Sequence, residues 1–257
     1  MVPPEIQGTG WLRAKATGVL AGVDVALAVF HRVDPTLDAR AILQDGAPLC
    51  PSNDIAVVRG SAAGILRAER IAHKFMQRMS GIASDTNRYV EAVRGLNARI
   101  VDTRKTAPGH RFLDKYSVRM GGGYNHRLNL ADGILIKDNH LQANAFREMG
   151  LKDVIQLALA RASHTIKVEV EVESMDQVQE ALEAGAHIIM LDNMSVAEMA
   201  EAMKVIGDRA IVEASGGITY DTVRAVAETG VDLISIGGLT HSVDALDISL
   251  DLEFDKR

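Results

Sequence analysis

Residues Glu180–Asn193 read EALEAGAHIIMLDN, a short helical stretch followed by Gly185 and the mainly apolar run His187–Asp192. The same order of helix, glycine and apolar strand recurs at Ala92–Asp102 and at Ala225–Gly238. Short, continuously apolar strands are typical of parallel strands that are buried on both faces. Because α–β units repeat in this way, the sequence predicts either an open doubly wound sheet or a closed (β/α) barrel.

The residues that end the predicted strands favour the barrel. Polar or glycine residues follow nearly every strand candidate, at Asp102–Lys105, Lys137–His140, Glu171, Asp192-Asn193, Ser215–Gly217 and Gly237-Gly238. In a (β/α) barrel the site is built where the carboxyl ends of several strands meet, whereas a doubly wound sheet concentrates it at one switch point. We therefore predict a barrel, with further strands at Gly133–Ile136, Thr165–Glu173 and Ala210–Glu213.

A different pattern precedes residue 80. β-Rich segments are predicted at Gly10–Leu20 and Asp54–Leu66, around an apolar helical run at Val23–Val33. A long helix then leads out of this region, with apolar positions at Ile71, Phe75 and Met79. The expected division is a small α/β domain over residues 1–82, a barrel over 83–244, and a C-terminal tail, 245–257, that packs on the first domain.

Composition and charge narrow the class of protein. Of the 257 residues, 47% are hydrophobic and 24% are charged, which is ordinary for a globular protein. The net charge of −6 argues against a nucleic-acid partner, and the single cysteine, Cys50, excludes an internal disulfide framework. No stretch approaches the ~20 apolar residues of a membrane span, and no basic-then-apolar leader is present. A cytoplasmic protein is expected.

One segment of this acidic chain is basic. Between Arg104 and Lys137, seven Lys and Arg residues face two Asp residues, which leaves five positive charges (7 − 2). Such an island predicts a small anionic ligand rather than a long polyanion. The alternative is a solvated helix face, which fits the spacing of Arg111, Lys115 and Arg119 equally well.

Two features inside this segment carry specific chemistry. Gly121-Gly122-Gly123 is followed within three residues by His126-Arg127, where Arg offers a planar fork for a carboxylate and His a switchable donor. Lys137 directly follows a predicted strand. A lysine in that position is either a Schiff-base nucleophile or an anion clamp, and the spacing does not separate the two roles.

The segment Thr165–Glu173 alternates acidic residues with valines. In a strand of period two, Glu169, Glu171 and Glu173 would face the barrel mouth while the valines pack under the outer helices. Converging carboxylates repel one another unless a cation lies among them, and Asp192 could share it. The set suits Mg²⁺, which takes one or two carboxylates and keeps water and phosphate ligands. The alternative is an edge strand with a solvated glutamate face.

Two glycine turns late in the chain suit a phosphate. Ser215-Gly216-Gly217 and Gly237-Gly238 each follow a predicted strand. Glycine permits close approach of the backbone, and the loops after the last strands of such barrels usually hold phosphate. Each pair is also compatible with a plain turn, and only their shared position at strand ends points to a ligand.

The ordered combination of these motifs resembles quinolinate phosphoribosyltransferases. The resemblance runs from about Gly8 to the C-terminus and is dense from Ser80 to Ser242. The motifs that carry it are Asp102-Thr103-Arg104-Lys105-Thr106-x-Pro-Gly, Gly121-Gly122-Gly123-x-Asn125-His126-Arg127, Leu135-Ile136-Lys137-Asp138-Asn139-His140, Glu169-Val170-Glu171-Val172, Leu191-Asp192-Asn193, Ser215-Gly216-Gly217 and Thr240-His241-Ser242.

The resemblance implies an architecture and a set of roles. The fold would be a small N-terminal α/β open-faced sandwich followed by an incomplete (β/α) barrel of the TIM type. Residues implied to bind quinolinate are Arg70, Arg104, His126, Arg127 and Lys137, with Arg70 lent to the neighbouring subunit's site. Those implied to bind phosphoribosyl pyrophosphate are Lys105, Lys137, Ser215, Gly216, Gly217, Gly237 and Gly238. Glu171 and Asp192 would hold Mg²⁺, and the implied catalytic set is Lys105, Lys137, Glu171 and Asp192.

The implied reaction joins the pyridine nitrogen to the ribose as diphosphate leaves, followed by loss of CO₂, to give nicotinate mononucleotide for NAD synthesis. A homodimer with shared active sites is implied, and a hexamer is compatible with it. Relative to the family, Met1 falls after a helical segment that commonly covers the partner's site, which implies altered substrate closure or altered dimer stability, whether the start is natural, truncated or misassigned. The rival predictions are a related phosphoribosyltransferase for another base, a Schiff-base lyase using Lys137, and a catalytically silent barrel.

Overall fold

The computed structural model describes residues 2–3 and 5–255, which divide between two units. Unit 1 contains the residues up to Arg88, Thr106–Gly123 and those from Gly238 onward. Unit 2 contains Tyr89–Lys105 and Tyr124–Gly237. Each unit is described by itself.

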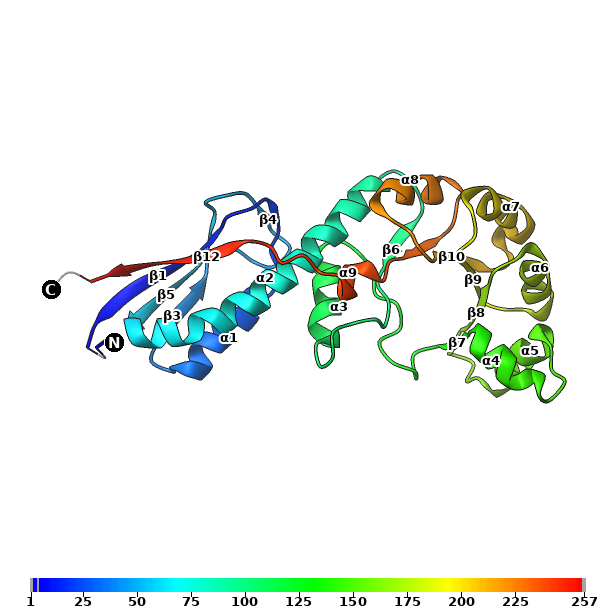
Figure 1. Ribbon diagram of the computed structural model, residues 1–257, viewed down its shortest axis with the longest axis horizontal. Helices are drawn as coiled ribbons and strands as arrows, with labels where there is room; N and C mark the ends of the chain where they lie inside the picture. The colour runs from blue at the N-terminus through cyan, green and yellow to red at the C-terminus, as the bar shows by residue number, and fades with distance from the viewer. Residues whose placement is uncertain (1, 4, 256–257) are drawn as a thin grey trace. The chain divides into compact units, whose positions relative to one another are not determined.

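Unit 1 is built on a four-stranded antiparallel sheet in the order β12-β1-β5-β3. The strands are β1 (Gln7–Ala14), β3 (Asp38–Ala41), β5 (Asp54–Ser61) and β12 (Ile248–Phe254). Two short strands, β2 (Gly18–Val19) and β4 (Pro48–Leu49), pair separately. The C-terminal segment therefore forms an edge strand of this sheet, beside the first strand of the chain (Figure 1).

Helices α1 (Val23–Val33) and α2 (Ala62–Ala92) pack on the sheet of unit 1, where one apolar core joins the three elements (Figure 1). Phe30 of α1 and Met76 of α2 are fully buried against strand residues such as Leu12. Burial of this apolar surface is the main force that holds helices to the sheet. Unit 1 is thus the open-faced sandwich that the family resemblance implied.

The β-rich segments predicted in unit 1 contain strands that are shorter than the segments. Gly10–Leu20 contains the end of β1, at Ala14, and the short strand β2, while Asp54–Leu66 contains β5, which ends at Ser61. Gly60 has φ = +136°, and the buried residues beyond it follow the helical spacing of Ala62, Ile65 and Ala68. In α2 the core-facing side is lined by such residues, whereas Ile71 is 50% exposed.

Helix α3 (Arg111–Met120) and the short helix α9 (Gly238–His241) also belong to unit 1. Arg78 of α2 explains how they are held. Its guanidinium donates to both carboxylate oxygens of the buried Asp114 at 3.1 and 2.9 Å, and to the Thr240 carbonyl at 2.9 Å. A bidentate pair of this kind is among the strongest side-chain contacts. Residues 106–123 therefore group with the first unit, outside the barrel to which the linear division at residue 82 assigned them.

Unit 2 is a six-stranded parallel sheet in the order β6-β11-β10-β9-β8-β7. The strands are β6 (Arg99–Val101), β7 (Ile134–Ile136), β8 (Val168–Val172), β9 (Ile188–Asp192), β10 (Ile211–Ser215) and β11 (Leu233–Ser235). The two end strands β6 and β7 are not paired with each other, so the barrel is incomplete. This confirms the predicted incomplete (β/α) barrel.

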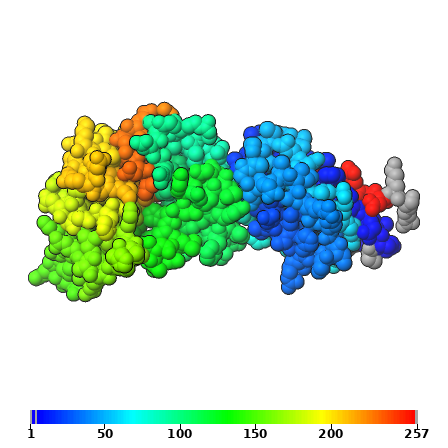
Figure 2. Space-filling view, turned by 180° about the vertical axis from the view of Figure 1, so that it is seen from behind, coloured from blue at the N-terminus to red at the C-terminus, as the bar shows by residue number. Residues whose placement is uncertain are grey.

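Helices cover the outer face of this sheet (Figure 1). They are α4 (Asp138–Ala145), α5 (Leu151–Arg161), α6 (Met175–Ala184), α7 (Val196–Ile206) and α8 (Tyr220–Glu228), with a 3₁₀ turn at Gly207–Arg209. In Figure 2, α5 to α7 form the surface that passes from yellow-green to yellow. Among the described residues, no helix is both long and apolar enough to span a membrane.

Strand β8 decides how the acidic residues are presented. It is paired on both sides, by β7 and β9, so the edge-strand alternative is wrong. Val168, Val170 and Val172 are fully buried, as expected for side chains beneath the outer helices. The alternate residues, Glu169 and Glu171, therefore point to the other face, which is the inside of the barrel.

Candidate active site

Lys137 and Glu171 meet at the carboxyl ends of two neighbouring strands. Lys137 directly follows β7, and Glu171 lies near the end of β8, which pairs with β7 in parallel. The Lys137 ammonium donates to Glu171 Oε2 in a partly buried ion pair. An ammonium committed to a carboxylate is not the neutral amine that Schiff-base chemistry requires. The contact suits an anion clamp whose charge is balanced until a ligand arrives.

Asp192 ends β9, the next strand along the sheet. Its Oδ2 accepts a hydrogen bond of 2.8 Å from the side-chain amide of Asn193. Val172 of β8 pairs with Leu191 of β9, so Glu171 and Asp192 stand at the same end of adjacent strands. Among the described residues, neither belongs to a cluster of three close metal-ligating side chains. Two carboxylates without a third ligand fit Mg²⁺, which fills its octahedron with water and substrate phosphate.

The loop after β10 leaves room above a glycine backbone. Gly216 and Gly217 have φ of +87° and +60°, in the region that glycine adopts without strain. A Cβ on Gly216 would lie 2.3 Å from Asn193 Oδ1, so no side chain fits there. A Cβ on Gly217 would meet no atom within 4 Å. The turn is therefore closed on one side and open on the other, as a backbone cradle for an anion must be.

The second glycine pair and its neighbours are also at strand ends. Gly237 lies two residues beyond β11, and Gly238 begins α9 and is as open above its Cα as Gly217. Ser215 is the last residue of β10 and accepts the Asn193 N–H through its carbonyl at 3.0 Å. Lys105 is exposed, and its backbone N–H donates to Thr103 Oγ1 at 3.0 Å.

Arg104 and Arg127 carry guanidinium groups whose like charges act on each other, and neither forms an ion pair among the described residues. Arg127 donates to the Gly133 carbonyl at 2.9 Å, and Arg104 Nε is buried with no hydrogen-bond partner. Burial, reinforced by the like charge of Arg104, lowers the pKa of Arg127. Two half-buried guanidinium groups that form no ion pair among the described residues are suited to a negatively charged ligand.

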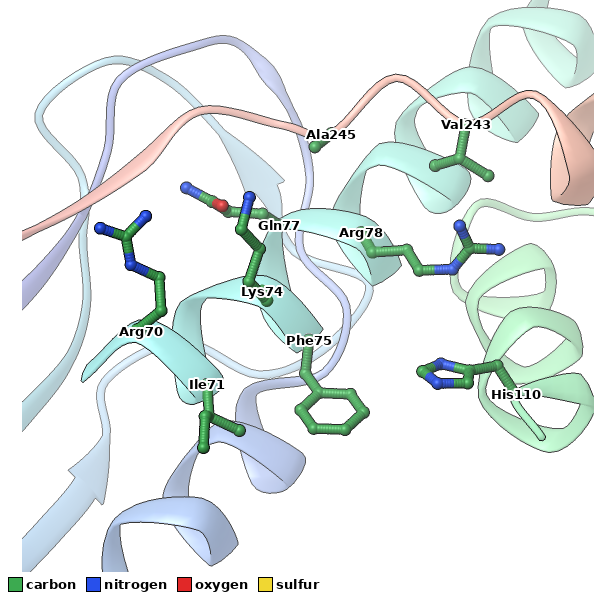
Figure 3. Close-up of a pocket in the computed structure, with 9 residues that line it drawn as sticks. All are labelled: Arg70, Ile71, Lys74, Phe75, Gln77, Arg78, His110, Val243 and Ala245. Atoms are coloured by element: carbon green, nitrogen blue, oxygen red, sulfur yellow. The ribbon is translucent and has the colours of Figure 1, made fainter. Parts of the chain in front are cut away.

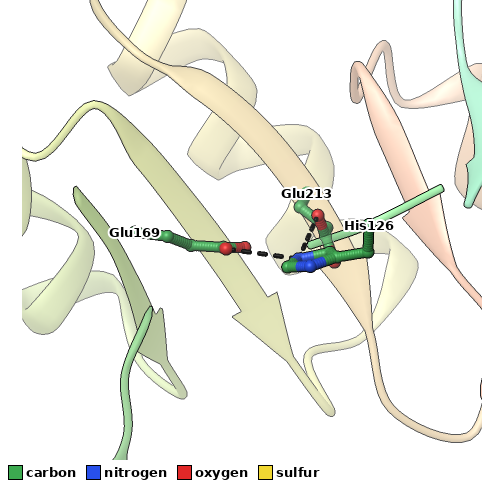
Figure 4. Close-up of side chains that lie close together, drawn as sticks. All are labelled: His126, Glu169 and Glu213. Carbon is green, nitrogen blue, oxygen red and sulfur yellow. Dashed lines mark ion pairs between the residues drawn. The ribbon is translucent and has the colours of Figure 1, made fainter. Parts of the chain in front are cut away.

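His126 lies between two buried carboxylates (Figure 4). Its Nε2 is 3.2 Å from Glu169 Oε2 and 3.5 Å from Glu213 Oε2. Burial lowers the pKa of His126, but the hydrogen bond to Glu169 and the charges of both glutamates outweigh it, so the pKa is raised overall. Burial, reinforced by the charge of Glu169, raises the pKa of Glu213 to about 7. The barrel interior thus holds a buried carboxyl, Glu213, whose pKa lies near neutrality.

Sequence reasoning missed Glu213. It placed Glu213 at the end of a strand over Ala210–Glu213, whereas β10 runs from Ile211 to Ser215 with Glu213 in its middle, 1% exposed. The available signal was an acid inside an otherwise apolar strand, since such a side chain is almost never buried without a role. The contact between Glu213 and His126 could not be predicted, because the two residues are far apart in the sequence and only the fold brings them together.

Arg70 belongs to unit 1, where it is exposed on α2. It lines a pocket of ≈ 390 Å³ together with Ile71, Lys74, Phe75 and His110 (Figure 3). The rings of Phe75 and His110 stack at a centroid distance of 5.8 Å. The pocket wall is mixed apolar and basic, and Arg70 has no ion-pair partner among the described residues.

The chain matches known proteins along its whole length. Residues 1–80 match the pattern of the quinolinate phosphoribosyl transferase N-terminal domain, and residues 82–251 match that of its C-terminal domain. A relative from Bacillus subtilis, named probable nicotinate-nucleotide pyrophosphorylase [carboxylating], is 41% identical over 93% of this chain and 81% of its own length. The nicotinate-nucleotide pyrophosphorylase [carboxylating] of Mycobacterium leprae is 42% identical, over 98% of this chain and 88% of its own.

A solved structure agrees with these matches. The NadC protein of Streptococcus pyogenes superposes with a TM-score of 0.92 at 40% identity. The alignment covers 99% of this chain and 89% of that one. Both units of the fold are therefore shared with a solved protein.

Proposed function

The chain belongs to the quinolinate phosphoribosyl transferase family, and we propose that it is a pentosyltransferase of the class EC 2.4.2.19. It transfers the phosphoribosyl group of phosphoribosyl pyrophosphate to quinolinate with decarboxylation. The products are nicotinate mononucleotide, diphosphate and CO₂, in the de novo synthesis of NAD. The observation that carries the proposal is the pair of Arg104 and Arg127, which forms no ion pair among the described residues, together with the strand-end carboxylates of Glu171 and Asp192, which suit a metal-bound diphosphate.

Quinolinate carries two adjacent carboxylates, and the basic pocket suits that charge. Arg104 and Arg127 each offer a planar fork that can bind a carboxylate through two N–H donors. Lys137 supplies a third cation once its contact with Glu171 opens, and His126 lies beside Arg127. A base with a single carboxylate would leave part of this positive charge unbalanced, which favours the dicarboxylate.

Phosphoribosyl pyrophosphate is expected at the carboxyl ends of the strands. Ser215, Gly216, Gly217, Gly237 and Gly238 would hold its 5′-phosphate through backbone N–H groups. Lys105 and Lys137 would face the diphosphate. Mg²⁺ held by Glu171 and Asp192 would balance the diphosphate charge and order the ribose hydroxyls.

The chemistry requires positioning and fixed charge rather than a covalent nucleophile. The basic pocket orients the pyridine nitrogen toward the anomeric carbon. The positive charges of Lys105 and Lys137 stabilise the negative charge that develops on the departing diphosphate. The nitrogen–carbon bond forms as the carbon–oxygen bond to diphosphate breaks. The quaternised ring then accepts the electron pair left when the carboxylate next to the nitrogen departs as CO₂, and a proton replaces it.

The proposal extends to assembly and location. Arg70, exposed beside the pocket of Figure 3, would enter the active site of a second copy, which makes a homodimer the functional unit and a hexamer compatible with it. The cytoplasm is the proposed compartment, since the one cysteine, Cys50, offers no internal disulfide.

Product formation tests the function. Protein, phosphoribosyl pyrophosphate and Mg²⁺ are incubated with quinolinate or, in parallel, with nicotinate, and nicotinate mononucleotide is separated by chromatography. Product from quinolinate only is expected. Product from nicotinate only would indicate a related transferase for another base, and substrate trapped on Lys137 by borohydride would indicate a lyase.

The variant Arg104→Ala sharpens that result. Loss of charge-assisted hydrogen bonds should lower kcat/KM for quinolinate by roughly 100-fold or more. Arg40→Ala is the matched control, because Arg40 is exposed on β3 and pairs with Asp38, two residues before it, at 2.8 Å. Equal activity of the two variants would show that Arg104 does not bind quinolinate.

A further inference from the structure

Both ring nitrogens of His126 are occupied within the protein. Nδ1 accepts the backbone N–H of Arg127 at 2.8 Å, and Nε2 faces Glu169 at 3.2 Å and Glu213 at 3.5 Å (Figure 4). A ring nitrogen that accepts a hydrogen bond carries no proton, so in the neutral ring the proton is on Nε2. The ring therefore donates toward the carboxylates and accepts from the next residue along the chain.

This tautomer argues against a metal at the cluster. His126, Glu169 and Glu213 place their ligand atoms within 4.8 Å of one another, a spacing that could hold a cation. A metal needs the lone pair of Nε2, which is the nitrogen that carries the proton here. Binding would require the proton to leave or to move to Nδ1, which would then lose the Arg127 N–H. The geometry is that of a hydrogen-bonded seat for the ring.

Further polar contacts hold the backbone and the ring of His126. The His126 backbone N–H donates to Asp102 Oδ1 at 2.9 Å, and the Asn125 side chain donates to Asp102 Oδ2 at 2.6 Å. Glu169 and Glu213 stand on β8 and β10, two strands that are separated by β9, and both are almost fully buried. Glu213 Oε2 lies 3.5 Å from Nε2 of His126, and the side chain of Ser235 also interacts with the Glu213 carboxyl.

From this arrangement, and on the basis of the proposed function, we infer that His126 is a positioning residue, which Glu169 and Glu213 seat and which aims Arg127 at a substrate carboxylate. The link is the hydrogen bond from the Arg127 N–H to Nδ1, because it fixes the backbone from which the guanidinium extends. That guanidinium is further held by the Gly133 carbonyl at 2.9 Å. Arg127, not the imidazole, contacts the carboxylate, and His126 gives no N–H to the substrate.

Replacements of His126 separate positioning from direct contact. Asn places an amide oxygen where Nδ1 stood and can still accept the Arg127 N–H, whereas Ala cannot. His126→Ala should raise KM for quinolinate by roughly 10- to 100-fold, and His126→Asn should restore it to within about fivefold of the wild type. KM for phosphoribosyl pyrophosphate should stay within about twofold in both variants. Equal impairment of Asn and Ala, or no change in either, would overturn the inference.

Glu169 offers a second, independent comparison. Gln keeps an oxygen that accepts the Nε2–H, so Glu169→Gln should hold KM for quinolinate within about fivefold, while Glu169→Ala should raise it by roughly 10-fold or more. If Glu169→Gln raised KM for quinolinate as much as Glu169→Ala does, the negative charge of Glu169 rather than its hydrogen bond to His126 would be required, and the inference would fail for this residue. The Mg²⁺ concentration for half-maximal rate serves as the control and should not change.

A readout without turnover keeps the inference distinct from the proposed function. Protein labelled with ¹⁵N-histidine is examined by NMR at alkaline pH, and the His126 signals are those lost in His126→Asn. The expected spectrum has a protonated Nε2 and an unprotonated, hydrogen-bonded Nδ1, even if quinolinate is not the substrate. A protonated Nδ1, or a His126 signal shifted by stoichiometric Zn²⁺ alone, would overturn the assignment.

Discussion

The two sheets of this protein bury different kinds of side chain. In unit 1, the inner face of the antiparallel sheet is apolar, and Leu12, Ile55 and Val58 are fully buried beneath the helices. In unit 2, the inner face of the parallel sheet carries Glu169 and Glu213, which are 4% and 1% exposed. The sheet of unit 1 therefore buries apolar side chains, whereas the sheet of unit 2 buries carboxyl groups.

The charges of unit 1 are treated in another way. Arg13 at the sheet surface is shared between Asp54 at 2.6 Å and Asp251 at 3.0 Å. Asp114, the fully buried acid of this unit, receives both N–H groups of the Arg78 fork. In unit 2, by contrast, the buried Glu213 forms no ion pair with a lysine or arginine among the described residues, and its nearest charged partner is Nε2 of His126 at 3.5 Å. Unit 1 is arranged for stability, whereas the interior of unit 2 gives up stability for a polar site.

The largest expected effect is on unit 1. Phe30→Ala empties a fully buried position in the core and should lower the free energy of unfolding by about 4 kcal/mol. Denaturant unfolding measures the loss. Turnover per folded molecule should change little at a permissive temperature, because no predicted site residue is a member of this core. Phe254→Ala, at a mostly exposed position on β12, is the matched control and should change stability by less than about 0.5 kcal/mol.

Glu213→Gln should raise the free energy of unfolding, whereas Phe30→Ala lowers it. The folded pKa of Glu213 is raised to about 7 from an ordinary 4.5, so the contribution of this group to stability is fully present below pH 4.5 and is lost as the pH rises through 7. A neutral amide escapes that loss and should be more stable than the wild type at pH 8, by about 2 kcal/mol.

The measurement is the difference in unfolding free energy between Glu213→Gln and the wild type, followed from pH 5 to 8. The difference should grow with pH, and subtraction removes the contribution of groups common to both proteins. Exposed Glu253 on β12 supplies the matched acid-to-amide control, for which the difference should stay flat. A flat difference for Glu213→Gln as well would mean that ionisation of the buried Glu213 does not lower the stability of the folded protein.

The smallest expected effect concerns Asp45 in unit 1. Its carboxylate accepts the N–H groups of Gly22 at 2.8 Å and Val23 at 3.0 Å, at the start of α1, and the Tyr116 hydroxyl at 2.8 Å. Asp45→Ala should therefore lower stability by about 1 kcal/mol.

Tyr116 reports the same change spectroscopically. Burial and the hydrogen bond to Asp45 raise its pKa to about 12. In Asp45→Ala, the pKa of Tyr116 should move back toward its ordinary value, measured by ultraviolet absorbance. A pKa that did not move would show that burial alone accounts for it.

Much of the fold could be predicted from periodicity alone. The repeated helix–glycine–strand pattern predicted a parallel sheet, because a buried parallel strand must be apolar on both faces, and the polar residues at the strand ends favoured the barrel over a doubly wound sheet. Strand ends were less predictable. The segment after Gly60 is as apolar as a strand, and only packing against the sheet core made it a helix from Ala62 onward.

The candidate site divides in the same manner. The sequence by itself determined that carboxylates, cations and glycines follow the strands, since the chain order of a barrel brings strand ends together. Only the tertiary structure decided which side chains meet: Lys137 with Glu171, and His126 with Glu169 and Glu213. The physical reason is that these contacts join residues 34 to 87 positions apart, and their strength comes from burial, which no local pattern records.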